Sequence, residues 1–141
     1  MKTLVISILF MLFTLLSFGQ SGSIVVEING CENSNGGILL GLYNSESGFL
    51  EFDKSYKGAF VKANKGTVLH TFTAIPAGKY ALAVWHDEDE NKKLDKNIIG
   101  VPKEKYGFSN NRFGKFGPPD FNEASFKVED NKKTTLIINL K

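Results

Sequence analysis

Short runs of alternating apolar and polar residues, separated by turn-forming residues, are the feature of this 141-residue chain that most restricts its fold. In the run 23–29 (SIVVEIN), Ile24, Val26 and Ile28 recur at every second position, a period that places them on one face of a β-strand. No stretch has a convincing helical period. Similar strands are expected at 38–43, 59–63, 67–73, 79–86, 124–128 and 136–140. About seven short strands joined by Gly, Asn and Pro turns predict an all-β fold, an immunoglobulin-like or transthyretin-like β-sandwich with one long irregular loop.

The connections between these runs carry further expectations. Residues 33–37 (NSNGG) have turn chemistry, and they predict that the first two strands form a hairpin. The runs 38–43 and 79–86 are apolar on both faces, which predicts central strands. Residues 44–57 predict a polar connection or a short helical turn. The segment 87–121, acidic at first and then rich in Gly, Pro and aromatic residues, is too irregular to predict sheet or helix.

The first residues have the composition of a secretory signal peptide. Lys2 supplies a positive start, residues 4–18 form an apolar run, and small residues surround a cleavage point at Gly19. The run is short for a spanning helix, and a strand pattern rather than a basic stop follows it. The sequence therefore predicts a signal peptide at 1–19, a single domain at 20–141, and a secreted or periplasmic protein with no membrane insertion after cleavage.

Charge and cysteine content argue against several classes of partner and site. The formal net charge is only +2 at pH 7, so the sequence predicts no nucleic-acid binding and no electrostatic attachment to an anionic membrane. Cys31 is the only cysteine, so no disulfide within the chain, zinc cluster or thiol-redox motif is expected. A lone structural thiol is the main expectation, and a catalytic pair of Cys31 with His70 or His86 stays open as an alternative.

An acidic string follows the strand at 79–86. Oxygen-bearing side chains recur at every second position in D-x-D-x-N, and a further carboxylate stands at the ninth position. Such alternation in a tight loop lets several oxygens converge on one hard cation, and calcium accepts irregular geometry. The candidate ligands are Asp87, Asp89, Asn91, the backbone carbonyl of Lys93, and Asp95. The sequence predicts a calcium (Ca2+) site here.

Two departures separate this string from an EF-hand loop. Lys92 occupies the sixth position, where glycine eases the sharp turn, and Ile98 occupies the twelfth, where a glutamate binds with both oxygens. Glu104, in the following loop, is the candidate that replaces the missing carboxylate. The alternative is a solvated acidic turn in which Lys92 and Lys93 provide local counter-charges.

Aromatic residues are spaced through the second half of the irregular segment at intervals that fit neither helix nor strand. Such a loop stays ordered when its rings pack on the sheet or on a partner. A binding surface for a glycan or an envelope protein would use Tyr106, Phe108, Phe113 and Phe116 as its contacts. The alternative is an Ω-like loop whose rings pack against one another. Trp85 is expected in the core.

Three motifs, in this order, resemble a known family. Residues 75–95 (IPAGKYALAVWHDEDENKKLD), 100–110 (GVPKEKYGFSN) and 116–126 (FGPPDFNEASF) are similar to the pattern of the secreted bacterial family catalogued as domain of unknown function 2141. The resemblance covers essentially the whole chain after the signal peptide, with Asp89 and Lys92 standing where the family has Asn and Gly. It implies an extracytoplasmic β-sandwich and no established reaction.

Two main classes of function follow from these residues. The first is a non-catalytic binding or accessory module of the cell envelope, stabilised by calcium and binding through its aromatic loop. The alternative is a metal-assisted hydrolase that uses the acidic loop with His86 or Glu104 as base, although no nucleophile, histidine-cluster or phosphate-binding motif accompanies them. A purely structural, oligomerising role is a third hypothesis, and the pattern does not determine an oligomeric state.

Overall fold

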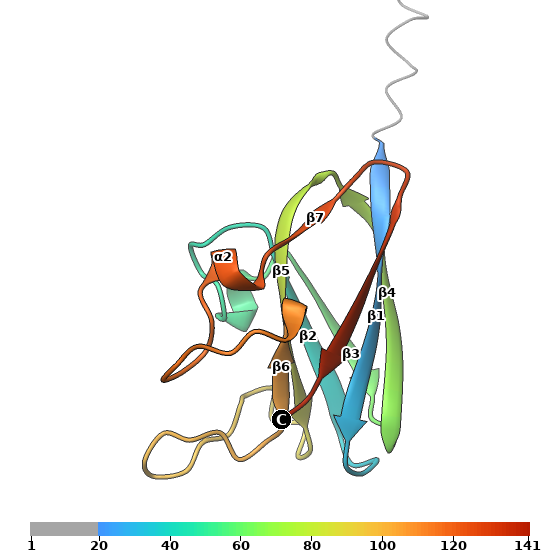
Figure 1. The fold of residues 1–141 in the computed structure, drawn as a ribbon. Helices are drawn as coiled ribbons and strands as arrows, with labels where there is room; N and C mark the ends of the chain where they lie inside the picture. The colour runs from blue at the N-terminus through green and yellow to red at the C-terminus, as the bar shows by residue number, and fades with distance from the viewer. Residues whose placement is uncertain (1–19) are drawn as a thin grey trace, which may run out of the picture.

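Two β-sheets pack face to face in the structure, a computed structural model that describes residues 20–141 (Figure 1). The predicted signal peptide, residues 1–19, lies outside the described part. The first sheet has the strand order β4-β1-β8, and the second has the order β3-β2-β5-β6, with β7 also paired to β5. The strands are β1 (Ser21–Cys31), β2 (Gly37–Tyr43), β3 (Lys57–Lys62), β4 (Gly66–Pro76), β5 (Gly78–Asp87), β6 (Tyr106–Phe108), β7 (Phe126–Val128) and β8 (Lys133–Asn139). The predicted all-β sandwich is confirmed.

Alternate residues of both sheets fill the space between them. In β1, which runs antiparallel to β4 and parallel to β8, the predicted inward residues Ile24, Val26 and Ile28 are fully buried. Full burial of such a side chain stabilises the fold by about 1.5–3 kcal/mol, so this shared core is the main source of stability. The core residues contributed by β2 and β5 are Ile38, Leu40, Leu42, Tyr80, Leu82 and Val84.

The prediction that the first two strands form a hairpin is wrong. β1 pairs with β4 and β8, whereas β2 pairs with β3 and β5 in the other sheet. The turn that follows Cys31 therefore carries the chain from one sheet to the other. Gly36, with a φ of 59°, completes this turn. The same Asn- and Gly-rich chemistry serves a hairpin and a sandwich corner, so the local pattern does not distinguish the two.

The segment after β5 is more regular than predicted. Its residues Tyr106–Phe108 form β6, which pairs antiparallel with β5, and Phe121–Ala124 form the helical turn α2. Ala124, predicted in a strand, lies in this helical turn instead. Residues 20–141 contain eight strands rather than about seven, because a three-residue strand is too short to show a period. The other short helices are η2 (Phe52–Lys54), in the predicted connection, and η3 (Ser109–Asn111). Within residues 20–141, no helix has the length and apolar character needed to cross a membrane.

The outer face of the second sheet positions the candidate site. Since β2 and β5 use alternate residues for the core, the intervening residues point to the other side of the sheet. On that side Gly41 lies opposite Ala83, and Ala83 lies opposite Phe108 of β6. Two small residues therefore stand at the middle of the outer face, and the rings of Tyr43 and Phe108 pack beside them. The loops that follow β2, β5 and β6 cover this face (Figure 1).

Candidate functional site

The end of β5 sends two neighbouring polar side chains to opposite sides of the sheet. Asp87 continues the outer-face series, and His86 continues the core-face series; both are fully buried. The Asp87 carboxylate accepts hydrogen bonds from the backbone N–H groups of Asn91 (3.1 Å) and Lys92 (2.8 Å). One buried carboxylate thus fixes the first turn of the acidic loop, residues 87–95.

Glu104 joins the acidic loop from the other side. Its two carboxylate oxygens accept hydrogen bonds from the backbone N–H of Glu88 and of Asp95, each at 3.1 Å. Burial raises the pKa of Glu104, and the charges of Asp87 and Asp95 raise it further, against the lowering effect of these two hydrogen bonds. Glu104 therefore holds both ends of the loop while its negative charge lies close to other carboxylates.

The structure brings three predicted ligands together. Asp87, Asp89 and Glu104 each offer an oxygen, and these atoms lie within 4.8 Å of one another. We call these three residues the acidic cluster. An all-oxygen donor set of this kind fits a hard cation such as Ca2+ or Mg2+ and is poorly suited to softer metals. Glu104, the residue predicted to replace the carboxylate missing from the EF-hand pattern, is one of these three.

Asn91, Lys93 and Asp95, the other predicted ligands, are linked to one another and to the acidic cluster by hydrogen bonds. The side-chain nitrogen of Asn91 donates to Asp89 (3.0 Å) and to Asp95 (3.1 Å), and its oxygen accepts from the backbone N–H of Lys93 (2.7 Å). Asp95 is outside the group of mutually close oxygens. In this arrangement Asn91 and Asp95 act as supports of the loop.

Lys92 makes the sharp turn without the glycine of the EF-hand pattern. Its φ is 61°, in the left-handed region where a side chain is disfavoured. We expect Lys92→Gly to raise the free energy of unfolding by about 0.5–1 kcal/mol, because relief of backbone strain exceeds the entropy gained by the unfolded chain. Chemical denaturation measures this difference. Lys93→Gly, at a position without positive φ, is the control and is expected to destabilise; a loss of stability in both variants would contradict the strain argument.

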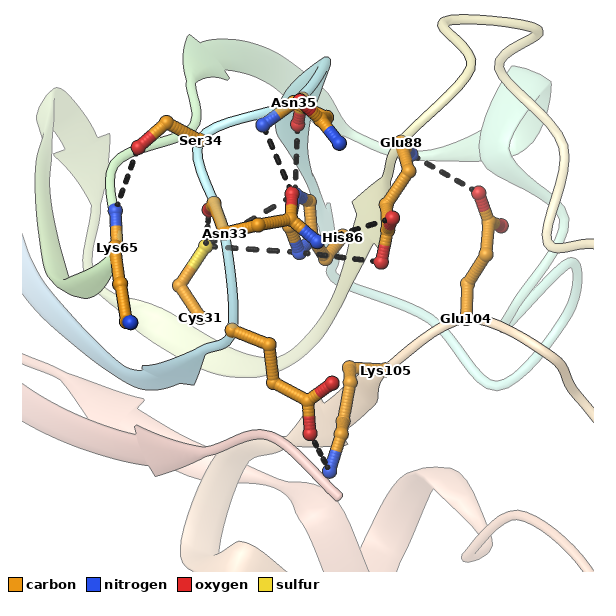
Figure 2. Close-up of polar contacts among 10 residues, drawn as sticks. Cys31, Asn33, Ser34, Asn35, Lys65, His86, Glu88, Glu104 and Lys105 are labelled. Carbon is orange, nitrogen blue, oxygen red and sulfur yellow. Dashed lines mark hydrogen bonds and ion pairs between the residues drawn. The ribbon is translucent and has the colours of Figure 1, made fainter.

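His86, on the core side of the sheet, is bonded to the turn after β1; Figure 2 shows it beside Cys31, Asn33 and Asn35. Its Nε2 lies 2.8 Å from the backbone oxygen of Asn35, and its Nδ1 lies 3.6 Å from Sγ of Cys31. Glu88 approaches the same ring at 4.0 Å and accepts a hydrogen bond from the Asn33 side chain (3.1 Å). His86 therefore ties the turn after β1 to the end of β5.

The Cys31–His86 contact raises the question of a reactive thiol. Cys31 is buried, and this burial raises the pKa of its thiol, with Glu88 adding to the rise. His70 lies elsewhere, edge-on to Phe72. We expect native protein to react with a thiol-specific disulfide reagent at least about a hundredfold more slowly than urea-unfolded protein. Rapid stoichiometric reaction of the native chain would show an activated cysteine.

The predicted aromatic contacts divide into two groups. Tyr106, Phe108 and Phe113 pack edge-on against one another, with ring centroids 5.6–5.7 Å apart, as the Ω-like alternative expects. Phe116 is fully exposed. The packing of these three rings orders the loop, and the ring of Phe116 takes no part in it.

A groove of about 900 Å³ lies over the outer face of the second sheet. Its floor includes Ala83, Trp85, Tyr106 and Phe108, and residues from 50–53, 91–102 and 116–118 form its walls. We call it the outer groove. Neither His86 nor Glu104 lines it. Three loops distant in sequence thus converge on one apolar hollow, and the acidic loop is one of them.

Sequence reasoning missed the buried aromatic residues of this groove. Trp85 and Tyr43 both line it, on the outer face of the sheet rather than in the shared core. The available signal was the alternation in 79–87, which places Trp85 on the same side as small Ala81 and Ala83 and opposite to Val84. Small residues on one face of a central strand indicate that other parts of the chain, or a ligand, pack over that face.

The comparison with known proteins bears on this whole arrangement. No curated protein and no solved structure matches the chain. A family described as an uncharacterized protein conserved in bacteria (DUF2141) matches residues 26–136. This span begins in β1, ends in β8 and contains the acidic cluster and the outer groove, and it confirms the resemblance carried by the three motifs. The chain belongs to the DUF2141 family.

Proposed function

We propose that this protein is a non-catalytic binding module of the cell envelope that holds its ligand in the outer groove. The observation that carries this proposal is the convergence of three loops over an apolar hollow of about 900 Å³. Its volume and its mainly apolar and aromatic lining are those of sites that bind small ligands. The secreted or periplasmic location rests on the signal-peptide pattern of residues 1–19 alone.

We also propose that bound calcium holds in place the wall of this groove that the acidic loop forms. Asn91 and Lys92 line the groove, and their backbone N–H groups are bonded to Asp87 of the acidic cluster. An ion shared by Asp87, Asp89 and Glu104 would neutralise their mutual repulsion and hold the loop against the sheet. Calcium would then act on binding by ordering the wall, with no part in chemistry.

A binding role has better support than the hydrolase alternative. A base for metal-assisted hydrolysis has to stand within reach of the substrate and the ion. His86 lies on the core side of the sheet and is bonded to Asn35, and the groove lining does not include Glu104. The two predicted bases, His86 and Glu104, are thus outside the lining of the outer groove.

The experiment uses Trp85, the only tryptophan, as the reporter of groove binding. Its emission is recorded against a panel of oligosaccharides, envelope-derived peptides and amphiphiles, and a saturable change with at least one member is expected. Ala83→Leu, which fills the floor, is expected to abolish that change. Thr71→Leu adds the same side chain at an exposed position of β4 and is the matched control. A flat response across the panel, or binding that survives Ala83→Leu, overturns the proposal.

A further inference from the structure

We infer that the ligand of the outer groove is an amphiphilic anion, with an apolar body and an oxygen-bearing head of the long-chain carboxylate type. The inference rests on the proposed binding function and adds the class of ligand. Four features of the groove support it: the floor, two buried donors with no partner, the charge of one wall, and the apolar side chains at the mouth.

The floor of the groove is shaped for an apolar body. Ala83 lines the floor among the rings of Trp85, Tyr106 and Phe108. Gly41, its neighbour in the register of β2 and β5, is outside the lining. A Cβ atom on Gly41 would lie 2.8 Å from the hydroxyl oxygen of Tyr43, so the ring of Tyr43 occupies the space that the glycine leaves. Phe52 packs edge-on against Trp85 at 5.3 Å. An apolar, aromatic floor favours a chain or ring without hydroxyl groups over a densely hydroxylated sugar.

Two buried hydrogen-bond donors in this lining have no partner. Trp85 is 8% exposed and Tyr43 is 2% exposed, and both line the groove. Within the described residues 20–141, neither the indole Nε1 of Trp85 nor the hydroxyl of Tyr43 has a hydrogen-bond partner. Burial, with the charge of Glu51, raises the pKa of Tyr43 to about 12, so this hydroxyl keeps its proton. Unpartnered buried donors are rare, and an indole N–H only donates, so the ligand should supply an acceptor oxygen.

Three lysines line the wall that the segment between β5 and β6 builds. Lys92, Lys93 and Lys96 line the groove, and within residues 20–141 none of them forms an ion pair with a carboxylate. Asp53 is the acidic side chain of the lining, on another wall. Three ammonium groups against one carboxylate favour an anionic head over a neutral or cationic one.

The lips of the groove continue the apolar surface. Val101 and Phe116, from two different loops, line the groove while remaining 51% and 102% exposed. Ile98 and Ile99, a few residues before Val101 in the chain and outside the lining, are also exposed. Large exposed apolar side chains gathered at the mouth of a pocket mark a surface that contacts something apolar. A chain longer than the groove would extend between these lips.

The test compares probes that share one chain and differ in the head. Trp85 emission is titrated with monomeric dodecanoate, dodecyl maltoside and dodecyltrimethylammonium, with chitohexaose as the sugar. Dodecanoate is expected to bind saturably and at least about tenfold more tightly than the maltoside, and the cation and chitohexaose are expected to give no saturable change. Lys92→Gln/Lys96→Gln should weaken dodecanoate at least about fivefold and leave the maltoside unchanged. Lys62→Gln/Lys133→Gln, outside the lining, removes the same charge and should change neither.

Tyr43→Phe separates a binding role from a structural one. Removal of a buried hydroxyl with no partner is expected to leave the melting temperature equal or higher, and to weaken dodecanoate about threefold to tenfold. If Tyr43 only packed against its neighbours, its substitution would not weaken binding while leaving the melting temperature equal or higher. Unchanged affinity in this variant counts against the acceptor argument and overturns that part of the inference.

The outcomes also separate this inference from the proposed function. Saturable binding of chitohexaose or a peptide, abolished by Ala83→Leu, with no response to dodecanoate, overturns the ligand class and leaves the binding module in place. Binding to phosphatidylglycerol–phosphatidylcholine vesicles without a response to the monomer also overturns it, since the lips then attach to a surface and the groove captures nothing. No response to any probe overturns both.

Discussion

Millimolar calcium is expected to raise the melting temperature of the chain by about 4–10 °C, because an ion present at 10–100 times its Kd adds about 1.4–2.7 kcal/mol to the stability of a domain of this size. The ion would bind the acidic cluster, whose three carboxylates lie within 4.8 Å of one another. Differential scanning calorimetry in calcium and in chelator measures the shift. Asp87→Ala/Asp89→Ala is expected to remove it completely.

Single variants distinguish the structural role of Asp87 from the role of Asp89 in the calcium response. Asp87 is buried and bonds two backbone N–H groups, so Asp87→Ala should lose about 2–4 kcal/mol even in chelator. Asp89 is exposed and bonds only Asn91, so Asp89→Ala should melt near the wild type in chelator and lose most of the calcium response. Glu46→Ala, an exposed carboxylate outside the cluster, should keep the full response. Superimposable melting curves of the wild type in calcium and in chelator would remove the ion from the account.

Gly36→Ala is expected to lower the free energy of unfolding by about 3 kcal/mol or more, the second large effect. A Cβ atom at Gly36 would lie 2.0 Å from the backbone oxygen of Asp87, and its φ is 59°. The nearest atoms to this Cβ all belong to the backbone, so no flexible side chain can move to relieve the clash. Since the clash pushes on the end of β5, the same variant should also weaken the calcium response.

Gly66→Ala is the matched control for this prediction. Its φ is 99°, and a Cβ atom there would meet nothing within 4 Å. It should lose only the strain of an unfavourable φ, about 1–3 kcal/mol. Urea denaturation of both variants measures the difference. If both variants lost the same free energy of unfolding, the added methyl group at Gly36 would not clash with Asp87. Close packing of the turn after β1 against the end of β5 would then be contradicted.

The period-two pattern predicted most of the sandwich, because each long strand alternates between the core and the other face. Ile24, Val26 and Ile28 are buried as expected, and 38–43 and 79–86 are central strands. Pairing was not predictable in the same way. The turn at 33–37 crosses between sheets, and β6 consists of three residues whose identity as a strand comes only from its neighbour β5.

The candidate site was predictable where its residues are close in sequence. The spacing of Asp87 and Asp89 placed both at one end of a strand, and the lack of a twelfth-position glutamate pointed to Glu104. The outer groove depends on loops that meet only in three dimensions, so no local pattern contains it. Trp85 was expected in the core for this reason; it is buried, but on the other face of the sheet.

A calcium titration followed by two-dimensional nitrogen–proton NMR tests the central claim most directly. The backbone N–H groups of Glu88, Asn91, Lys92 and Asp95 are bonded to the carboxylates of Asp87 and Glu104. These four amide signals are expected to shift together and saturably, with one ion per chain. Signals that stay in place here, or that move no more than those beside exposed carboxylates such as Glu129, would contradict a calcium site at the wall of the groove.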